Sequence, residues 1–148
     1  MRAAVALGLF GLLGCHPALF DLDKLIAIET DNEVARASLV SGVAELGGRV
    51  GDLASQHVRA VVECRCQTSV PNSVATACTL GGVIYLCPVS LSCPRCVKHE
   101  LGHVFGAAHS ADPADLMYPI PKPGVESFSV ADKKAICASG VVVGGVCD

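Results

Sequence analysis

The chain has 148 residues, of which 51% are hydrophobic and 17% charged, with nine cysteines and no tryptophan. This length suits one small domain, and so little charge argues against intrinsic disorder. The net charge is −3 and Lys and Arg form no cluster, which argues against nucleic-acid binding. Every apolar run is shorter than the roughly 20 residues that a membrane-spanning helix needs, which excludes a multispan membrane protein.

The N-terminus has the organisation of an export signal, with Arg2 followed by an apolar run and the small residue Gly14. The tetrapeptide LLGC that ends at Cys15 resembles a bacterial lipobox, which implies cleavage before Cys15 and attachment of a lipid to its thiol. A plain secretory signal with an incidental cysteine is the alternative. We expect a protein that is exported and lipid-anchored in the bacterial cell envelope, at the outer membrane or the periplasmic face. The domain division that we expect is a signal peptide at 1–14, a short tether at 15–23 and a folded domain at 24–148.

The cysteine count agrees with lipidation, because setting Cys15 aside leaves an even number that can all pair. Disulfides are the usual state of cysteines in an exported small domain. The sequence leaves the pairing open, and the C-x-C and C-x-x-C spacings keep a thiolate metal site as an alternative. The disulfide candidates are Cys64, Cys66, Cys78, Cys87, Cys93, Cys96, Cys137 and Cys147.

The first half of the domain predicts a strand, a helix and a second strand. The segment 24–30 is short and contains several β-branched residues, which indicates a strand. A helix is predicted over 31–46, with Thr30 and Glu33 as a capping box and a Gly-Gly pair after its end. Residues 58–65 predict the second strand.

The second half predicts a hairpin and two helices. Strands at 73–80 and 83–87 flank a Gly-Gly turn. Segment 81–87 is either a rim strand that pairs with an extended substrate or a strand inside the sheet. A helix is expected from Ser92, as its N-cap, to Phe105, and another over 131–138 with a capping signal at 129–132. For the apolar, glycine-rich end of the chain we predict only a strand or coil.

The motif that carries chemistry is HELGH at residues 99–103. His99 and His103 lie four residues apart, so they share one helix face. Gly106 can take a positive φ and end the helix, and the returning chain brings His109 to the same point. Three imidazoles leave the fourth position of a zinc ion open for water, as in catalytic zinc sites, and Glu100 can act as the general base. The alternative, a core helix with satisfied histidines, leaves this grouping of three of the chain's five histidines unexplained.

HELGHVFGAAH followed by Met117 resembles the metzincin metallopeptidases, and Ser110 with the LMYP run at 116–119 resembles the matrixins among them. Residues 128–136 are similar to the start of the matrixin C-terminal helix. The resemblance implies a small α+β domain with a mixed twisted sheet, an N-terminal helix, an active-site helix and a C-terminal helix. It also implies a zinc endopeptidase acting on polypeptides, with Met117 in a Met-turn that supports the metal.

The sequence also departs from the animal matrixins, which carry structural zinc and calcium ions. Between residues 58 and 98 the only acidic residue is Glu63 and there is no histidine. We therefore expect one catalytic Zn²⁺ and no calcium or structural zinc, and we expect disulfides to stabilise the domain in place of these ions. The expected partners are a polypeptide substrate and, through the N-terminal lipid, a membrane; we expect a monomer. Two alternatives are a catalytically inactive metzincin-fold lipoprotein that serves as a metal-dependent binding module, and a disulfide-built envelope protein without metal.

Overall fold

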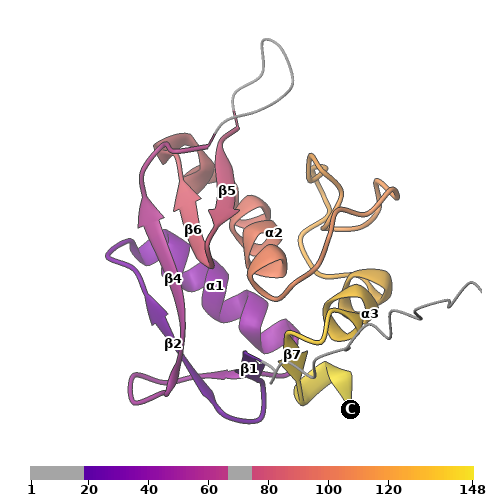
Figure 1. Cartoon of the computed structure of the whole chain (residues 1–148). Helices are drawn as coiled ribbons and strands as arrows, with labels where there is room; N and C mark the ends of the chain where they lie inside the picture. Colours follow the sequence, from indigo (N-terminus) through magenta and orange to yellow (C-terminus); the bar gives the residue numbers. More distant parts are fainter. Residues whose placement is uncertain (1–18, 67–74) are drawn as a thin grey trace, which may run out of the picture.

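The computed structural model describes residues 19–66 and 75–148 (Figure 1). The expected signal peptide, Cys15 and residues 15–18 of the expected tether lie outside the described residues, as do the first two residues of the strand predicted at 73–80. Within the described ranges, no helix is both long and apolar enough to cross a membrane.

A five-stranded sheet forms one layer of the fold, and its mixed character confirms the α+β prediction. Four neighbouring strands are parallel, and β5 at the edge runs antiparallel to β6. The rim-strand interpretation of segment 81–87 is therefore wrong, because β6 has a paired strand on both sides and β5 occupies the edge. The strand order is β3 (Arg49–Val50), β2 (Leu25–Glu29), β4 (Gln56–Val62), β6 (Val83–Leu86) and β5 (Ala77–Leu80).

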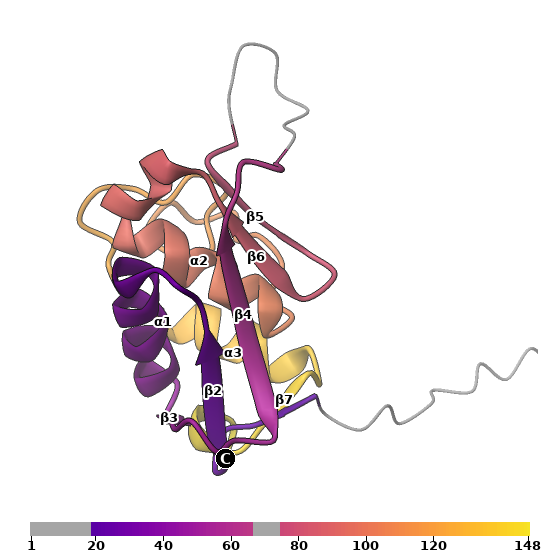
Figure 2. The same cartoon turned by 90° about the vertical axis from the view of Figure 1, so that its left-hand side faces the viewer.

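The helices α1 (Glu33–Glu45) and α2 (Pro94–Val104) pack on one side of this sheet, and α3 (Val130–Ala138) lies beyond α2, toward the C-terminus (Figures 1 and 2). Apolar side chains from the sheet and the helices meet in one core, which includes Ile26 and Leu101. On the opposite face of the sheet, the exposed His57 on β4 pairs with Glu29 at 2.8 Å.

The start of α1 differs from the prediction. The N-cap is Asn32, whose Oδ1 accepts hydrogen bonds from the backbone N–H groups of Val34 and Ala35, both at 3.0 Å. Thr30 instead accepts a hydrogen bond from the N–H of Asn32 at 3.3 Å, because β2 continues to Glu29 and leaves Thr30 in the turn. The predicted capping box is therefore wrong. The predicted cap of α3 is confirmed, because Ser129 and Asp132 form a reciprocal capping box.

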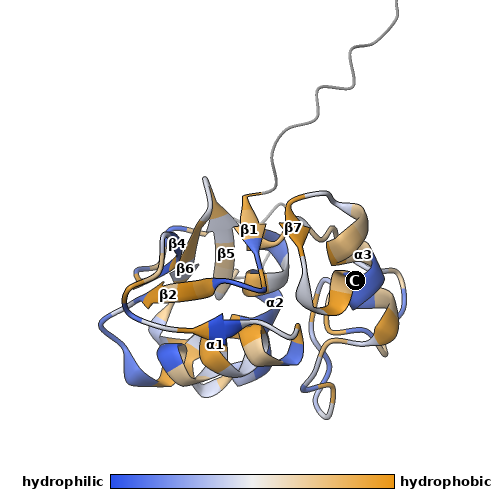
Figure 3. Cartoon of the chain, turned by 90° about the horizontal axis from the view of Figure 1, so that it is seen from below, coloured by the Kyte–Doolittle hydropathy of each residue, from blue (hydrophilic) through white to orange (hydrophobic). Residues whose placement is uncertain are grey.

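The two ends of the described chain pair with each other, so that β1 (Phe20–Asp21) lies parallel to β7 (Val142–Val143) and close to α3 (Figure 3). Phe20 also packs edge-on against Phe105, with ring centroids 4.9 Å apart. Residues 20 and 21, which we expected in the tether, thus belong to the folded domain. A short 3₁₀-helix (Gly145–Cys147) ends the chain.

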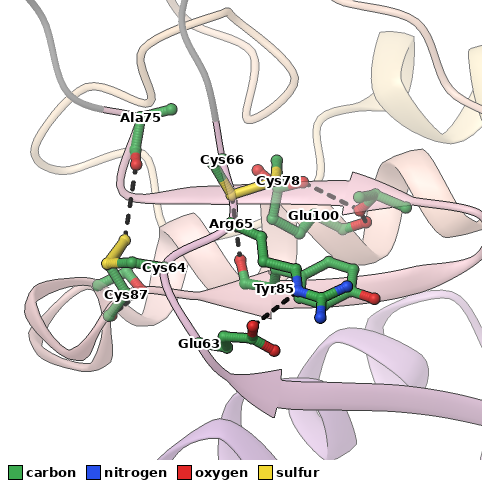
Figure 4. Close-up of a disulfide and its surroundings, with 11 residues drawn as sticks. Glu63, Cys64, Arg65, Cys66, Ala75, Cys78, Tyr85, Cys87 and Glu100 are labelled. Atoms are coloured by element: carbon green, nitrogen blue, oxygen red, sulfur yellow. Dashed lines mark hydrogen bonds and ion pairs between the residues drawn. A yellow bond between two sulfur atoms is a disulfide. The ribbon is translucent and has the colours of Figure 1, made fainter.

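All eight cysteines expected to pair do so, which confirms the disulfide prediction and excludes the thiolate metal site. Two bridges join the segment after β4 to the β5–β6 hairpin region (Figure 4). The third closes the first turn of α2, and the fourth ties α3 to the C-terminus. The pairs are Cys64–Cys87, Cys66–Cys78, Cys93–Cys96 and Cys137–Cys147.

Candidate metal centre

The helix α2 carries the HELGH motif and begins one residue later than predicted. Its N-cap is Cys93, and Pro94 occupies the first turn. Backbone N–H groups in the first turn have no partner within the helix, so the missing N–H of proline costs no hydrogen bond there. Ser92 belongs to the preceding 3₁₀-helix (Pro88–Ser92) and donates its hydroxyl to the carbonyl of Val89 at 2.8 Å. The prediction of Ser92 as the N-cap is therefore wrong, because its hydroxyl bonds to a residue that precedes it and not to a backbone N–H of α2.

The end of α2 follows the prediction. Gly106 has φ +85°, and a Cβ there would lie 2.6 Å from Oγ of Ser139. The chain then turns back, and the N–H of Ala107 donates to the carbonyl of Gly102 at 2.9 Å. Glycine is required at 106 both for its backbone conformation and for the close approach of α3. This return positions His109 opposite the helix.

The three motif histidines converge on one point. Nε2 of His103 lies 3.1 Å from Nε2 of His99 and 3.2 Å from Nε2 of His109. A tetrahedral ion with bonds of about 2.0–2.1 Å holds nitrogen ligands about 3.3 Å apart, close to the spacing observed. The arrangement could therefore hold a metal ion, and three imidazole nitrogens suit zinc.

Backbone carbonyls orient two of these rings. Nδ1 of His99 lies 2.8 Å from the carbonyl oxygen of Leu116, and Nδ1 of His103 lies 2.8 Å from that of Ala107. A carbonyl only accepts hydrogen bonds, so each Nδ1 carries the proton and each Nε2 presents a lone pair. Such hydrogen bonds on the far side of the ring are typical of metal-binding histidines.

Burial favours the neutral form of His99 and His109. It lowers the pKa of His99 to about 4, partly opposed by the hydrogen bond to Leu116 and reinforced by the charges of the other two histidines. The pKa of His109 is also lowered, first by burial and then by the charge of His103. Near pH 7 both rings are unprotonated, which is the form that binds a metal.

Glu100 lies in the same helix with its carboxyl group turned toward β5. The residue is only 6% exposed, and Oγ1 of Thr79 on β5 lies 2.9 Å from its Oε2. Burial raises the pKa of Glu100 to about 7, although the hydrogen bond from Thr79 opposes this shift. A carboxyl group that titrates near neutral pH is suited to accept and return a proton. Thr79 was not predicted from the sequence as part of this site.

Met117 lies directly against the motif helix. It is 1% exposed, and its side chain occupies the space that a Cβ on Gly102 would need. The carbonyl of Met117 accepts a hydrogen bond from the N–H of Ser110 at 2.8 Å, which ties the turn to the residue after His109. The structure thus brings His99, His103 and His109 together at one point, with Met117 packed against Gly102 of the same helix and Glu100 turned toward β5.

A comparison with protein families agrees with this geometry. The family model described as matrixin matches residues 19–138, which run from the start of β1 to the end of α3 and include the whole site. No curated protein matches the chain.

Proposed function

Because the chain belongs to the matrixin family, we propose that it is a zinc-dependent endopeptidase that hydrolyses peptide bonds of polypeptide substrates. The observation that carries this proposal is the convergence of three Nε2 atoms, together with the buried carboxyl group of Glu100 next to His99 in the helix α2. A protein that only binds metal needs the histidines but has no use for Glu100.

In the proposed mechanism His99, His103 and His109 hold the ion and Glu100 moves the proton. Zinc bound there would act as a Lewis acid: it would lower the pKa of a bound water to about 7 and polarise the carbonyl group that is attacked. Glu100 accepts the proton of the attacking water and then donates it to the nitrogen of the leaving amine. Its low exposure keeps bulk water away from the carboxyl group during this transfer.

The test is to compare the full, disulfide-bonded chain with Glu100→Ala for zinc content and for cleavage of a peptide library. Glu33→Ala, which removes an exposed carboxylate from the start of α1, is the matched control. We expect one zinc per chain in all three proteins, cleavage by the wild type and the control, and a loss of at least about 100-fold in Glu100→Ala. Undiminished cleavage by Glu100→Ala contradicts the mechanism.

The same experiment decides between the proposal and its alternatives. A wild-type chain that binds zinc and cleaves no peptide favours a catalytically inactive matrixin-fold binding module. A properly oxidised chain without zinc overturns the metal site itself. Chelation and re-addition of zinc, followed by the same cleavage assay, shows whether activity depends on the ion.

We also propose that the protein is exported and anchored in the bacterial envelope by a lipid on Cys15. The support is the signal-like N-terminus and the LLGC tetrapeptide, together with the mutual pairing of the other eight cysteines. Cys15→Ser is expected to move the protein from the membrane fraction to the soluble fraction and to abolish labelling by a radioactive fatty acid. Unchanged membrane retention contradicts the anchor.

A further inference from the structure

The hydroxyl of Thr79 joins the edge strand of the sheet to the helix that carries the metal-binding motif. Its Oγ1 lies 2.9 Å from Oε2 of Glu100 and 3.0 Å from the backbone carbonyl oxygen of the same residue. A threonine hydroxyl has one proton to donate, so these two oxygens are alternative acceptors. Among the described residues, no other side chain hydrogen-bonds the carboxyl group of Glu100.

The position of this hydroxyl is fixed by its strand. Thr79 pairs with Ile84 in the β5–β6 hairpin, and the preceding residue, Cys78, is bonded to Cys66. Figure 4 shows Glu100 beside the strand that carries Cys78. The helix α2 packs against β5 and β6, so the strand and the helix meet where the hydroxyl reaches the carboxyl group. The donor is therefore held by the sheet and not by the helix that carries Glu100.

A buried glutamate needs such a partner to take up one orientation. The side chain has three rotatable bonds, and a hydrogen bond to one carboxyl oxygen restricts them. With Oε2 held by Thr79, Oε1 has no hydrogen-bond donor among the described residues. One oxygen is thus anchored, and the other is left to exchange a proton.

We propose that Thr79 is a positioning residue for the general base: its hydroxyl holds Oε2 of Glu100 so that Oε1 faces the attacking water. The inference rests on the proposed endopeptidase function. In the reaction the proton leaves the water oxygen for Oε1 of Glu100 and later passes to the leaving nitrogen. Oε2 remains an acceptor throughout, so Thr79 keeps its own proton and its hydrogen bond in both states.

The test is steady-state peptide cleavage by Thr79→Val, which removes the hydroxyl and keeps the side chain's shape, and by Thr79→Ser, which keeps the hydroxyl. Thr76→Val is the matched control, since Thr76 lies just before β5 and has no hydrogen bond to Glu100. We expect Thr79→Val to lower kcat about 10- to 100-fold, as for the loss of part of a general-base contribution. We expect KM, zinc content and the unfolding temperature to stay near wild type, and Thr79→Ser to restore most of kcat.

Each other outcome contradicts the inference in a distinguishable way. If Thr79→Val keeps the kcat of the wild type, the hydroxyl does not position the base, although the endopeptidase function stands. If Thr79→Val and Thr79→Ser lose kcat equally, together with zinc or with the unfolding temperature, the role of Thr79 is structural. If the wild type binds zinc and cleaves no peptide, the proposed function fails, and the role of Thr79 fails with it.

Discussion

The carboxylate of Asp132, in the first turn of α3, accepts a hydrogen bond from the backbone N–H of Leu116 at 2.9 Å. The carbonyl of Leu116 in turn accepts the hydrogen bond from Nδ1 of His99. Asp132 is 1% exposed and also accepts hydrogen bonds from the N–H groups of Met117 and Ser129. One buried carboxylate thus links the cap of α3, the turn at Met117 and the orientation of a proposed metal ligand.

We therefore predict that Asp132→Ala weakens zinc binding although it touches no ligand. Loss of an indirect support of this kind lowers metal affinity about 10- to 100-fold. The free energy of unfolding of the metal-free chain should also fall by roughly 2–4 kcal/mol, because buried N–H groups lose a charged acceptor. Competition with a chromophoric chelator measures the affinity, and Asp112→Ala, an exposed carboxylate in the preceding loop, is the control. Equal affinities in the two variants contradict the link.

The second prediction concerns Gly102, inside the HELGH motif. A Cβ at this position would overlap the sulfur of Met117 and lie 3.2 Å from Cε1 of Phe128. Gly102→Ala should therefore lower the free energy of unfolding by about 1–3 kcal/mol, even though alanine favours a helix more than glycine does. Gly42→Ala in α1 is a milder comparison, because its Cβ would crowd one atom, Cδ2 of Leu101 at 2.7 Å, and would lie at ordinary van der Waals distance from Lys98 and Phe128. Chemical denaturation measures the free energy of unfolding of both variants. A Gly102→Ala variant that is more stable than the wild type contradicts the prediction, because it shows that the turn at Met117 moves aside at little cost.

What could be predicted from the sequence is what depends on local spacing. Two histidines four residues apart must share a helix face, and Gly106 must be free to end that helix, so the metal centre follows from a short stretch of chain. The cap at Ser129 is local in the same sense. The N-cap of α1, in contrast, does not depend on local spacing alone. Thr30 and Asn32 can both cap a helix, and the residue at which β2 ends selects Asn32.

The supporting contacts could not be predicted, because they join segments far apart in the chain. Thr79 and Glu100 are 21 residues apart, and Leu116 and Asp132 are 16 apart. A single threonine in a strand, or an aspartate in a capping box, has an ordinary local explanation and carries no sign of a distant partner. The pairing of β1 with β7 was missed for the same reason, since two-residue strands have no detectable periodicity.

The third prediction uses the titration of Glu100 in the metal-free chain. Its pKa rises from 4.5 in the unfolded chain to about 7 in the fold, so the folded state retains the proton more strongly. Stability therefore falls as pH rises from 4.5 to 7, by up to roughly 3 kcal/mol, and stays at that lower level above pH 7. His99 has the opposite effect, because its pKa falls to about 4 and its protonation in the unfolded chain destabilises the fold below pH 6.5.

A comparison with Glu100→Gln separates the two groups, because His99 is common to both proteins. The variant should be more stable than the wild type at pH 8, and this advantage should shrink toward pH 4.5. Urea denaturation of chelator-treated protein across this range measures the difference. An advantage that does not change with pH shows that burial does not penalise the ionised carboxylate. Added zinc should reduce the advantage, since a nearby cation favours the charged form of Glu100.

The last prediction separates the effect of a disulfide on stability from its effect on catalysis. It compares two disulfides that close loops of similar length. Cys66–Cys78 and Cys137–Cys147 span 12 and 10 residues, so in the chain-entropy description each contributes about 3 kcal/mol to the free energy of unfolding. Replacing both cysteines of either pair by serine should therefore lower stability by similar amounts. The Cys66–Cys78 bridge, however, adjoins Thr79 on the edge strand, whereas the other joins α3 to the C-terminus. Only the loss of Cys66–Cys78 should lower kcat, measured where both variants remain fully folded. An equal fall in kcat for both variants means that activity follows overall stability and not the position of β5.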